Sequence, residues 1–99
     1  MNRKEAKSKM KQILLTKNGV ENGLGTNSNF SKKERFDYVF DYVYKSLNGE
    51  YQNILSKTYI SPSFKYWWVE IYSKSSFYRL REKALTSFIS LFEMMYENI

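Results

Sequence analysis

Four polar residues near the start of the last amphipathic segment have side chains suited to contacting nucleic acids: Lys74, Ser75, Tyr78 and Arg79. The planar guanidinium of arginine can donate two hydrogen bonds to the edge of a guanine, while serine and lysine donate to base edges and phosphates. At about 100° per helical residue, Ser75 and Arg79 lie opposite Phe77. The start of this segment therefore suits contact with phosphates and base edges.

These side chains need a helix to position them, and the apolar pattern predicts one from the Ser73–Ser76 cluster to near residue 97. One apolar stripe falls within about 60° of arc and consists of Phe77, Leu80, Ala84, Phe88 and Leu91. A second stripe consists of Leu85, Ile89, Phe92 and Tyr96. Two interpretations fit the second stripe, namely packing by another helix of the same chain or by the equivalent helix of a homodimer.

Three further helices are expected upstream. A capping box from Ser31 to Glu34 would begin a helix that ends with a left-handed cap at Asn48-Gly49. A second helix of about ten residues covers 50–59 and stops before Pro62. A short third helix covers 63–71. The predicted fold class is all-α, a small helical domain of about four core helices with a C-terminal helix-turn-helix and a basic N-terminal helix or arm.

The helix-turn-helix prediction depends on the short helix, the tight turn "YSK" and the serine caps that follow it. The stretch "YSKSSFYRLREKAL" resembles the recognition helix of region four of bacterial sigma factors, and more closely that of the ArpU-type late transcriptional regulators of phages. In that resemblance Ser73 is the capping residue, Phe77 and Leu80 are buried, and Ala84-Leu85 is the terminal pair.

The resemblance continues upstream, where residues 54–73 are similar to the first helix of the same unit. It implies a DNA-binding transcriptional regulator in which the residues just after the cap read bases in the major groove of double-stranded DNA. By position these residues are Lys74, Ser75, Tyr78 and Arg79. The chain departs from the family pattern in the turn, which has Ile71-Tyr72 where a glycine is common. Nothing in the chain resembles the other sigma regions, so a stand-alone regulator or a polymerase-associated factor is implied.

The N-terminal segment is strongly basic. Residues 1–17 hold six Lys or Arg and one Glu, so they account for +5 of the chain's net charge of +6. Residues 17–29 are rich in Gly and Asn, which is typical of a linker. The expected division is an arm and linker over 1–29 and a helix-turn-helix domain over 30–99. The basic segment fits either an arm along the DNA backbone or a solvated tail, and a membrane-surface helix is disfavoured because its apolar face is short.

Phosphate contacts are expected from the remaining basic and hydroxyl side chains near these elements: Ser76, Lys83, Lys65, Arg3, Lys4, Lys7 and Lys11. An alternative is a protein-interaction module that docks a partner such as RNA polymerase through the aromatic surface of the last two helices. Trp67 and Trp68 fit core packing better than base stacking.

The amino-acid composition argues against several other classes of function. The chain has no His and no Cys, so the common nucleophile–base pairs, disulfides and thiolate metal sites cannot be built. Asp37 and Asp41 share a helix face without a third ligand at a recognisable spacing. We therefore expect no enzyme activity, metal or cofactor. No run is apolar enough for a membrane span, so a cytoplasmic location is expected. The abundant Lys, Asn, Tyr, Phe and Ile have AT-rich codons, which is typical of an AT-rich bacterial or phage genome.

Overall fold

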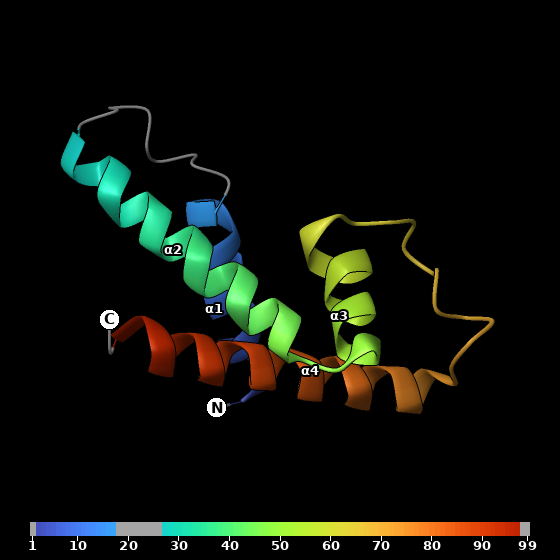
Figure 1. The fold of residues 1–99 in the computed structure, drawn as a ribbon. Coiled ribbons are helices and arrows are strands. Elements are labelled where there is room, and N and C mark those ends of the chain that lie inside the picture. Colours follow the sequence, from blue (N-terminus) through green and yellow to red (C-terminus); the bar gives the residue numbers. More distant parts are fainter. Residues whose placement is uncertain (1, 18–26, 98–99) are drawn as a thin grey trace.

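The structure is a computed structural model, and it describes residues 2–17 and 27–97. Most of these residues are helical and none of them forms a strand, which confirms the predicted small all-α fold. The elements in chain order are α1 (Arg3–Lys17), α2 (Asn27–Ser46), α3 (Gly49–Leu55), the π-helical turn η1 (Ser56–Ile60) and α4 (Lys74–Glu97). Helix α4 runs along one side of the molecule, and α1, α2 and α3 all pack on it (Figure 1).

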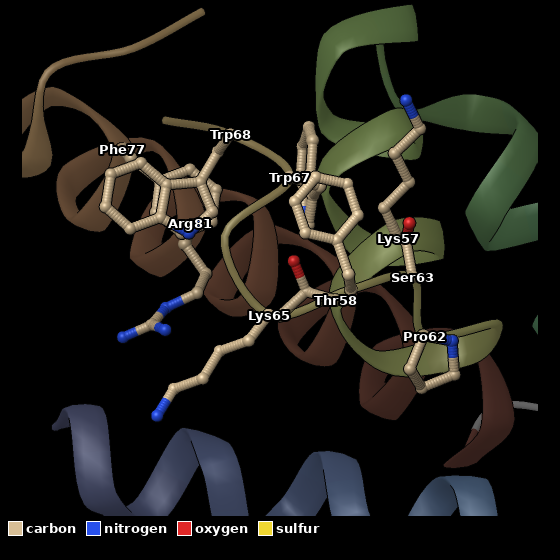
Figure 2. Close-up of a pocket in the computed structure, with 10 residues that line it drawn as sticks. Lys57, Thr58, Pro62, Ser63, Lys65, Trp67, Trp68, Phe77 and Arg81 are labelled. Carbon is tan, nitrogen blue, oxygen red and sulfur yellow. The ribbon is translucent and has the colours of Figure 1, made fainter. Parts of the chain in front are cut away.

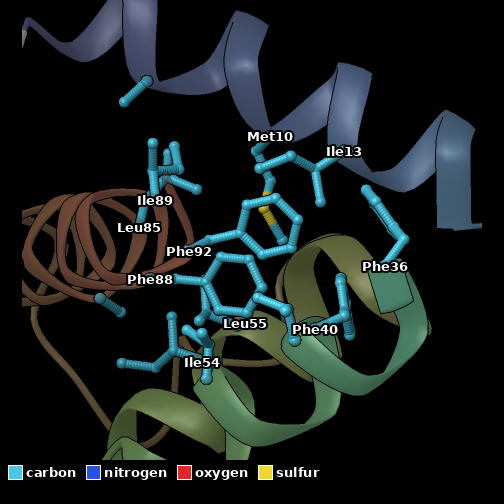
Figure 3. Packing of buried hydrophobic residues seen from close by; sticks show 14 of the residues in the cluster. Met10, Ile13, Phe36, Phe40, Ile54, Leu55, Leu85, Phe88, Ile89 and Phe92 are labelled. Carbon is cyan, nitrogen blue, oxygen red and sulfur yellow. The ribbon is translucent and has the colours of Figure 1, made fainter. Parts of the chain in front are cut away.

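Both apolar stripes of α4 are buried within the chain. Phe77, Ala84 and Phe88 of the first stripe are at most 1% exposed. Leu85, Ile89 and Phe92 of the second stripe lie in the same core cluster, where Met10 and Ile13 of α1 face them (Figure 3). Packing by α1 and α2 therefore covers the second stripe, and no homodimer is needed to cover it.

Helix α1 is part of this core and is not a free arm. Its Ala6, Met10 and Ile13 are buried, and Met10 is 0% exposed. The Lys9 ammonium lies 3.1 Å from the Glu93 carboxylate, which joins α1 to the far end of α4. Of the interpretations for residues 1–17, packing on the domain is the one the structure adopts. Residues 18–26 of the expected linker lie outside the described residues.

Asparagine and serine side chains begin three of the helices. Asn2 accepts a hydrogen bond from the Glu5 N–H at 2.7 Å, Asn48 accepts one from the Tyr51 N–H at 2.8 Å, and Ser73 accepts one from the Ser76 N–H at 3.3 Å. Asn48 therefore begins α3 from an extended conformation (φ −66°, ψ 162°), and the prediction that it forms a left-handed cap was wrong.

Helix α2 begins at Asn27, so the prediction of a helix start at Ser31 was also wrong.

The predicted short helix over 63–71 does not form. Residues 65–71 are consecutive turns, in which the N–H groups of Trp67, Val69 and Ile71 donate to carbonyls three residues earlier. Aromatic and β-branched residues have low helix propensity, and Pro62 removes a donor at the start of this segment. The ring of Trp68 stacks on Phe77 at 4.4 Å, which holds the connection against the first turns of α4.

Candidate nucleic-acid interface

Exposed cations from α1 and α4 meet on one side of the molecule. Two adjoining surface hollows share Glu82 as a lining residue, one between α1 and α4 and one between α3 and α4. Their basic lining residues form what we call the α1/α4 basic face: Arg3, Lys4, Lys7, Arg79 and Lys83. The packing of α1 on α4 thus brings together five of the residues that the sequence nominated for DNA contact.

Glu82 is the acidic residue that lines both hollows. Its carboxylate lies 3.5 Å from Nε of Arg3, and both side chains are largely solvent-exposed. An exposed ion pair of this kind is worth about 0–1 kcal/mol, so it orients Arg3 more than it stabilises the fold. The pair leaves a net positive potential over the face, because the other four cations form no ion pair within the described residues.

The first turns of α4 carry the other nominated base-reading residues. Lys74 and Ser75 are exposed, as is Arg79 one turn further on. Tyr78 is half-buried instead, since its ring lies 5.9 Å from Trp68 and 4.8 Å from the Arg81 guanidinium. Ser76 is also half-buried, and its N–H is used by the Ser73 cap. Three of the four predicted base-reading side chains are therefore exposed to solvent, and Tyr78 is only partly accessible.

Two nominated cations lie apart from the α1/α4 basic face. Lys11 is exposed on α1 but lines neither hollow. Lys65 lies in the 61–73 connection and lines a separate pocket with Trp67, Trp68 and Phe77 (Figure 2). The structure therefore does not gather the predicted phosphate contacts into a single surface.

The same pocket contains residues that sequence reasoning missed. Arg81 projects only about 40° from Phe77 around the helix, close to the buried stripe, so helix geometry does not mark it as a ligand contact. The long arginine stem nevertheless carries its guanidinium out past the core, where it lies 5.8 Å from the Phe77 ring. Lys57 reaches the pocket from η1, and its ammonium lies 5.0 Å from the Trp67 ring. A cation three or four residues from aromatic side chains was a signal that could have found Arg81, whereas Lys57 lies ten residues from Trp67 and carried no such signal.

The two helical segments on either side of the 61–73 connection are not joined by the short turn that was expected of a helix-turn-helix. The helical segment before α4 is α3 with η1, and residues 61–73 connect it to α4. A DNA-binding helix-turn-helix has a turn of about three or four residues. The α3–α4 pair therefore has a longer connection than the family pattern, although α4 begins at the cap that the resemblance assigned to Ser73.

Two other features of the described residues are the grouping of their acidic side chains and the apolar length of their helices. Residues 2–17 and 27–97 contain no group of three or more acidic side chains placed to hold a metal ion. None of the helices in these ranges has an apolar stretch of the length that a membrane span requires.

Comparison with protein-family models finds no match to this chain, and comparisons with curated proteins and with solved structures find none either.

Proposed function

We propose that this protein binds double-stranded DNA through the α1/α4 basic face and the first turns of α4. The observation that carries the proposal is the gathering of Arg3, Lys4, Lys7, Arg79 and Lys83 around two adjoining hollows. Clustered cations attract the phosphate backbone, because binding releases condensed counterions from the DNA. The chain as a whole has the same sign, with a net charge of +6.

The exposed side of α4 has dimensions that suit a DNA groove. From Lys74 to Lys83 the helix rises about 14 Å, which corresponds to about four phosphate steps along one strand. An α-helix fits the major groove of B-form DNA, so Lys74, Ser75 and Arg79 would face base edges there. The N-terminal end of α1 would then lie over the neighbouring backbone, where Arg3, Lys4 and Lys7 contact phosphates.

The resemblance to ArpU-type regulators and to sigma region four extends this proposal to transcriptional regulation. Its support is the capped start of α4 at Ser73 and the burial of Phe77 in the core. The long 61–73 connection counts against a close match to that unit. DNA binding is therefore the primary proposal, and control of transcription is the biological role that the resemblance suggests for it.

The test measures the affinity of the full chain for dye-labelled duplex DNA by fluorescence anisotropy. Arg79→Gln and Lys83→Gln each remove one charge from an exposed side chain and leave the core intact. We expect each to weaken binding about threefold to tenfold at ~50 mM salt and to reduce the slope of log affinity against log salt by about one.

Lys45→Gln is the matched control, because Lys45 is exposed on α2 and contributes to neither hollow. The affinity of the Lys45→Gln variant for duplex DNA should equal that of the unmodified chain. The proposal would be overturned if Arg79→Gln and Lys83→Gln bound the duplex as tightly as Lys45→Gln and the unmodified chain. Binding whose affinity did not depend on salt would also overturn it.

A second candidate function is docking of a protein partner such as RNA polymerase. The observation that favours it is a set of large apolar side chains on the 61–73 connection that are more than half exposed: Phe64, Tyr66, Val69 and Ile71. Exposed aromatic residues are enriched at protein interfaces. Binding through them should change little between ~50 and ~200 mM salt, whereas DNA binding through phosphates should weaken steeply.

A further inference from the structure

A pocket at the end of the molecule opposite the α1–α2 pair has a lining that the proposed duplex contact does not use. Its volume is about 280 Å³, close to the lower end of the range of about 300–1,000 Å³ for small-molecule sites. Residues of η1, the 61–73 connection and the first turns of α4 line it (Figure 2). The pocket has room for one small planar ligand rather than for a folded domain.

Every charged residue in the lining is a cation, namely Lys57, Lys65 or Arg81. Their side chains form no ion pair within residues 2–17 and 27–97. Lys65 and Arg81 extend in the same direction from the connection and from α4 (Figure 2). Like charges repel one another, so cations that line one pocket without a carboxylate favour the binding of an anionic group such as a phosphate.

Four aromatic residues, together with Thr58, Pro62 and Ser63, form the rest of the lining. Trp68 is half-buried and lies parallel to Phe77, with ring centroids 4.4 Å apart and planes 4° apart. Phe64 lines the same pocket and is 69% exposed, which is unusual for a phenylalanine. Phe77 is buried beneath Trp68, so a flat ring that entered the pocket would gain stacking contacts with Phe64 and Trp68. Such stacking does not depend on which base is present.

One polar atom beside these walls has no partner. The Thr58 hydroxyl is buried and makes no hydrogen bond in the described structure. A buried polar group without a partner is destabilising by about 1–3 kcal/mol, so a ligand that could bond to it would bind more tightly. Thr58 comes from η1, and π-helical turns are frequent at functional sites.

We propose that this pocket binds one unpaired nucleotide, whose base stacks on the aromatic walls while its phosphate pairs with Lys65 and Arg81. The proposal depends on the proposed function for the source of that nucleotide, which would be an unpaired position in the DNA held by the α1/α4 basic face. The combination of cations and aromatic rings is the one that proteins use for single-stranded nucleic acids. A phosphorylated peptide shares the anion but lacks a flat base, so the nucleotide fits the aromatic walls better.

The chain contains two tryptophans, and both line this pocket, so tryptophan emission reports directly on its occupancy. The test titrates the full chain with deoxyguanosine monophosphate, deoxyguanosine and inorganic phosphate, with emission corrected for absorption by the nucleotide. We expect saturable quenching by the monophosphate, with at least about tenfold weaker binding of the other two because each lacks one half of the contact. A hairpin with a short single-stranded overhang should also quench, and a blunt hairpin should quench less.

Two exposed residues provide variants that should fold normally. Lys65→Gln and Phe64→Ala should each weaken monophosphate or overhang binding about fivefold to tenfold. Ile71→Ala is the matched control, because Ile71 is a similarly exposed apolar residue of the same connection that does not line the pocket. Quenching by the overhang alone would identify DNA as the source of the nucleotide, and quenching by both probes would add the free nucleotide as a source.

Failure of this proposal can be separated from failure of the duplex proposal. Phe64→Ala should leave the affinity for blunt duplex unchanged, and Lys83→Gln should lower that affinity without changing monophosphate quenching. The pocket proposal is overturned if neither probe quenches saturably, if Lys65→Gln and Phe64→Ala bind like the unmodified chain, or if a phosphotyrosine peptide binds more tightly than the monophosphate.

Discussion

Two neighbouring hydroxyl groups in η1 are buried without a hydrogen-bond partner in the described structure, those of Thr58 and Tyr59. Both residues belong to the π-helical turn η1, which follows α3 directly and precedes the 61–73 connection. The Thr58 hydroxyl lies beside the proposed nucleotide pocket, so a ligand can supply its missing partner. Tyr59 does not line that pocket, and its hydroxyl is expected to be a net cost to the fold.

Tyr59→Phe should therefore leave stability unchanged or raise it. Replacing an unpaired buried hydroxyl by hydrogen removes a desolvation cost of about 1–3 kcal/mol, partly offset by the small cavity that the lost oxygen leaves. We expect a gain of about 0–1.5 kcal/mol in the free energy of unfolding, measured with urea at neutral pH. A loss of more than about 1 kcal/mol would show that the hydroxyl has a partner, such as a bound water molecule.

The same variant has a consequence at high pH. Burial raises the pKa of Tyr59 above its ordinary value, and the Arg81 guanidinium only partly opposes this effect. A phenol with a raised pKa in the folded state contributes stability that is fully present below about pH 10 and is lost as pH rises through the folded pKa. The unmodified chain should thus lose more stability above about pH 10 than Tyr59→Phe, as urea unfolding across that range would show.

At the scale of the helices, the key contact is the packing of α1 on α4. Met10→Ala removes a fully buried side chain from that contact and should lower the free energy of unfolding by about 2–5 kcal/mol. Lys11→Ala is the matched control on the same helix, because Lys11 is exposed, and it should change stability by less than about 0.5 kcal/mol. Equal urea midpoints for both variants would mean that α1 does not belong to the cooperative fold.

The helices that sequence reasoning located best are those whose apolar spacing and caps agree. Helix α4 satisfies both criteria, since Ser73 caps it and Phe77, Ala84 and Phe88 repeat at helical spacing. The segment 63–71 has the spacing without the burial, because Phe64 and Ile71 are exposed. Periodicity identifies residues that would share a helix face, but it cannot show that the face is covered.

The candidate site was only partly predictable for a related reason. The α4 residues Arg79 and Lys83 follow from helix geometry alone, whereas their proximity to Arg3 depends on how α1 packs. The positive charge of α1 favoured the interpretation as an exposed arm or tail. The helical spacing of Ala6, Met10 and Ile13 nevertheless indicated the side of α1 that is buried. Tertiary contacts between distant segments are not encoded in local periodicity, so the composite basic face and the nucleotide pocket required the structure.

For the whole molecule, the distribution of charge determines which side meets a polyanion. Glu82 is an acidic side chain within the α1/α4 basic face. Glu82→Gln removes its repulsion toward phosphates and releases Arg3 from its ion pair. We expect duplex affinity to rise about twofold to threefold at ~50 mM salt, with a smaller gain at ~200 mM because salt screens exposed charges.

Glu70→Gln is the control for that prediction, since it makes the same change in net charge at an exposed position of the 61–73 connection. A comparable gain in affinity for Glu70→Gln would indicate that overall charge governs binding. An unchanged or lower affinity for Glu82→Gln would place the DNA on another side of the molecule. Fluorescence anisotropy with one duplex at both salt concentrations distinguishes these outcomes.

The pairing of α1 with the far end of α4 also determines the order in which the chain can fold during synthesis. Lys9 and Glu93 are separated by 84 positions, yet their side chains meet. Helix α1 leaves the ribosome first, and its apolar side gains its main partner only when the last helix has emerged. Met10 and Ile13 therefore stay uncovered by α4 until residues 74–97 have left the ribosome, a period in which exposed apolar side chains invite chaperone binding or aggregation. The lysines that surround them on α1 would help to keep the nascent helix in solution until α4 arrives.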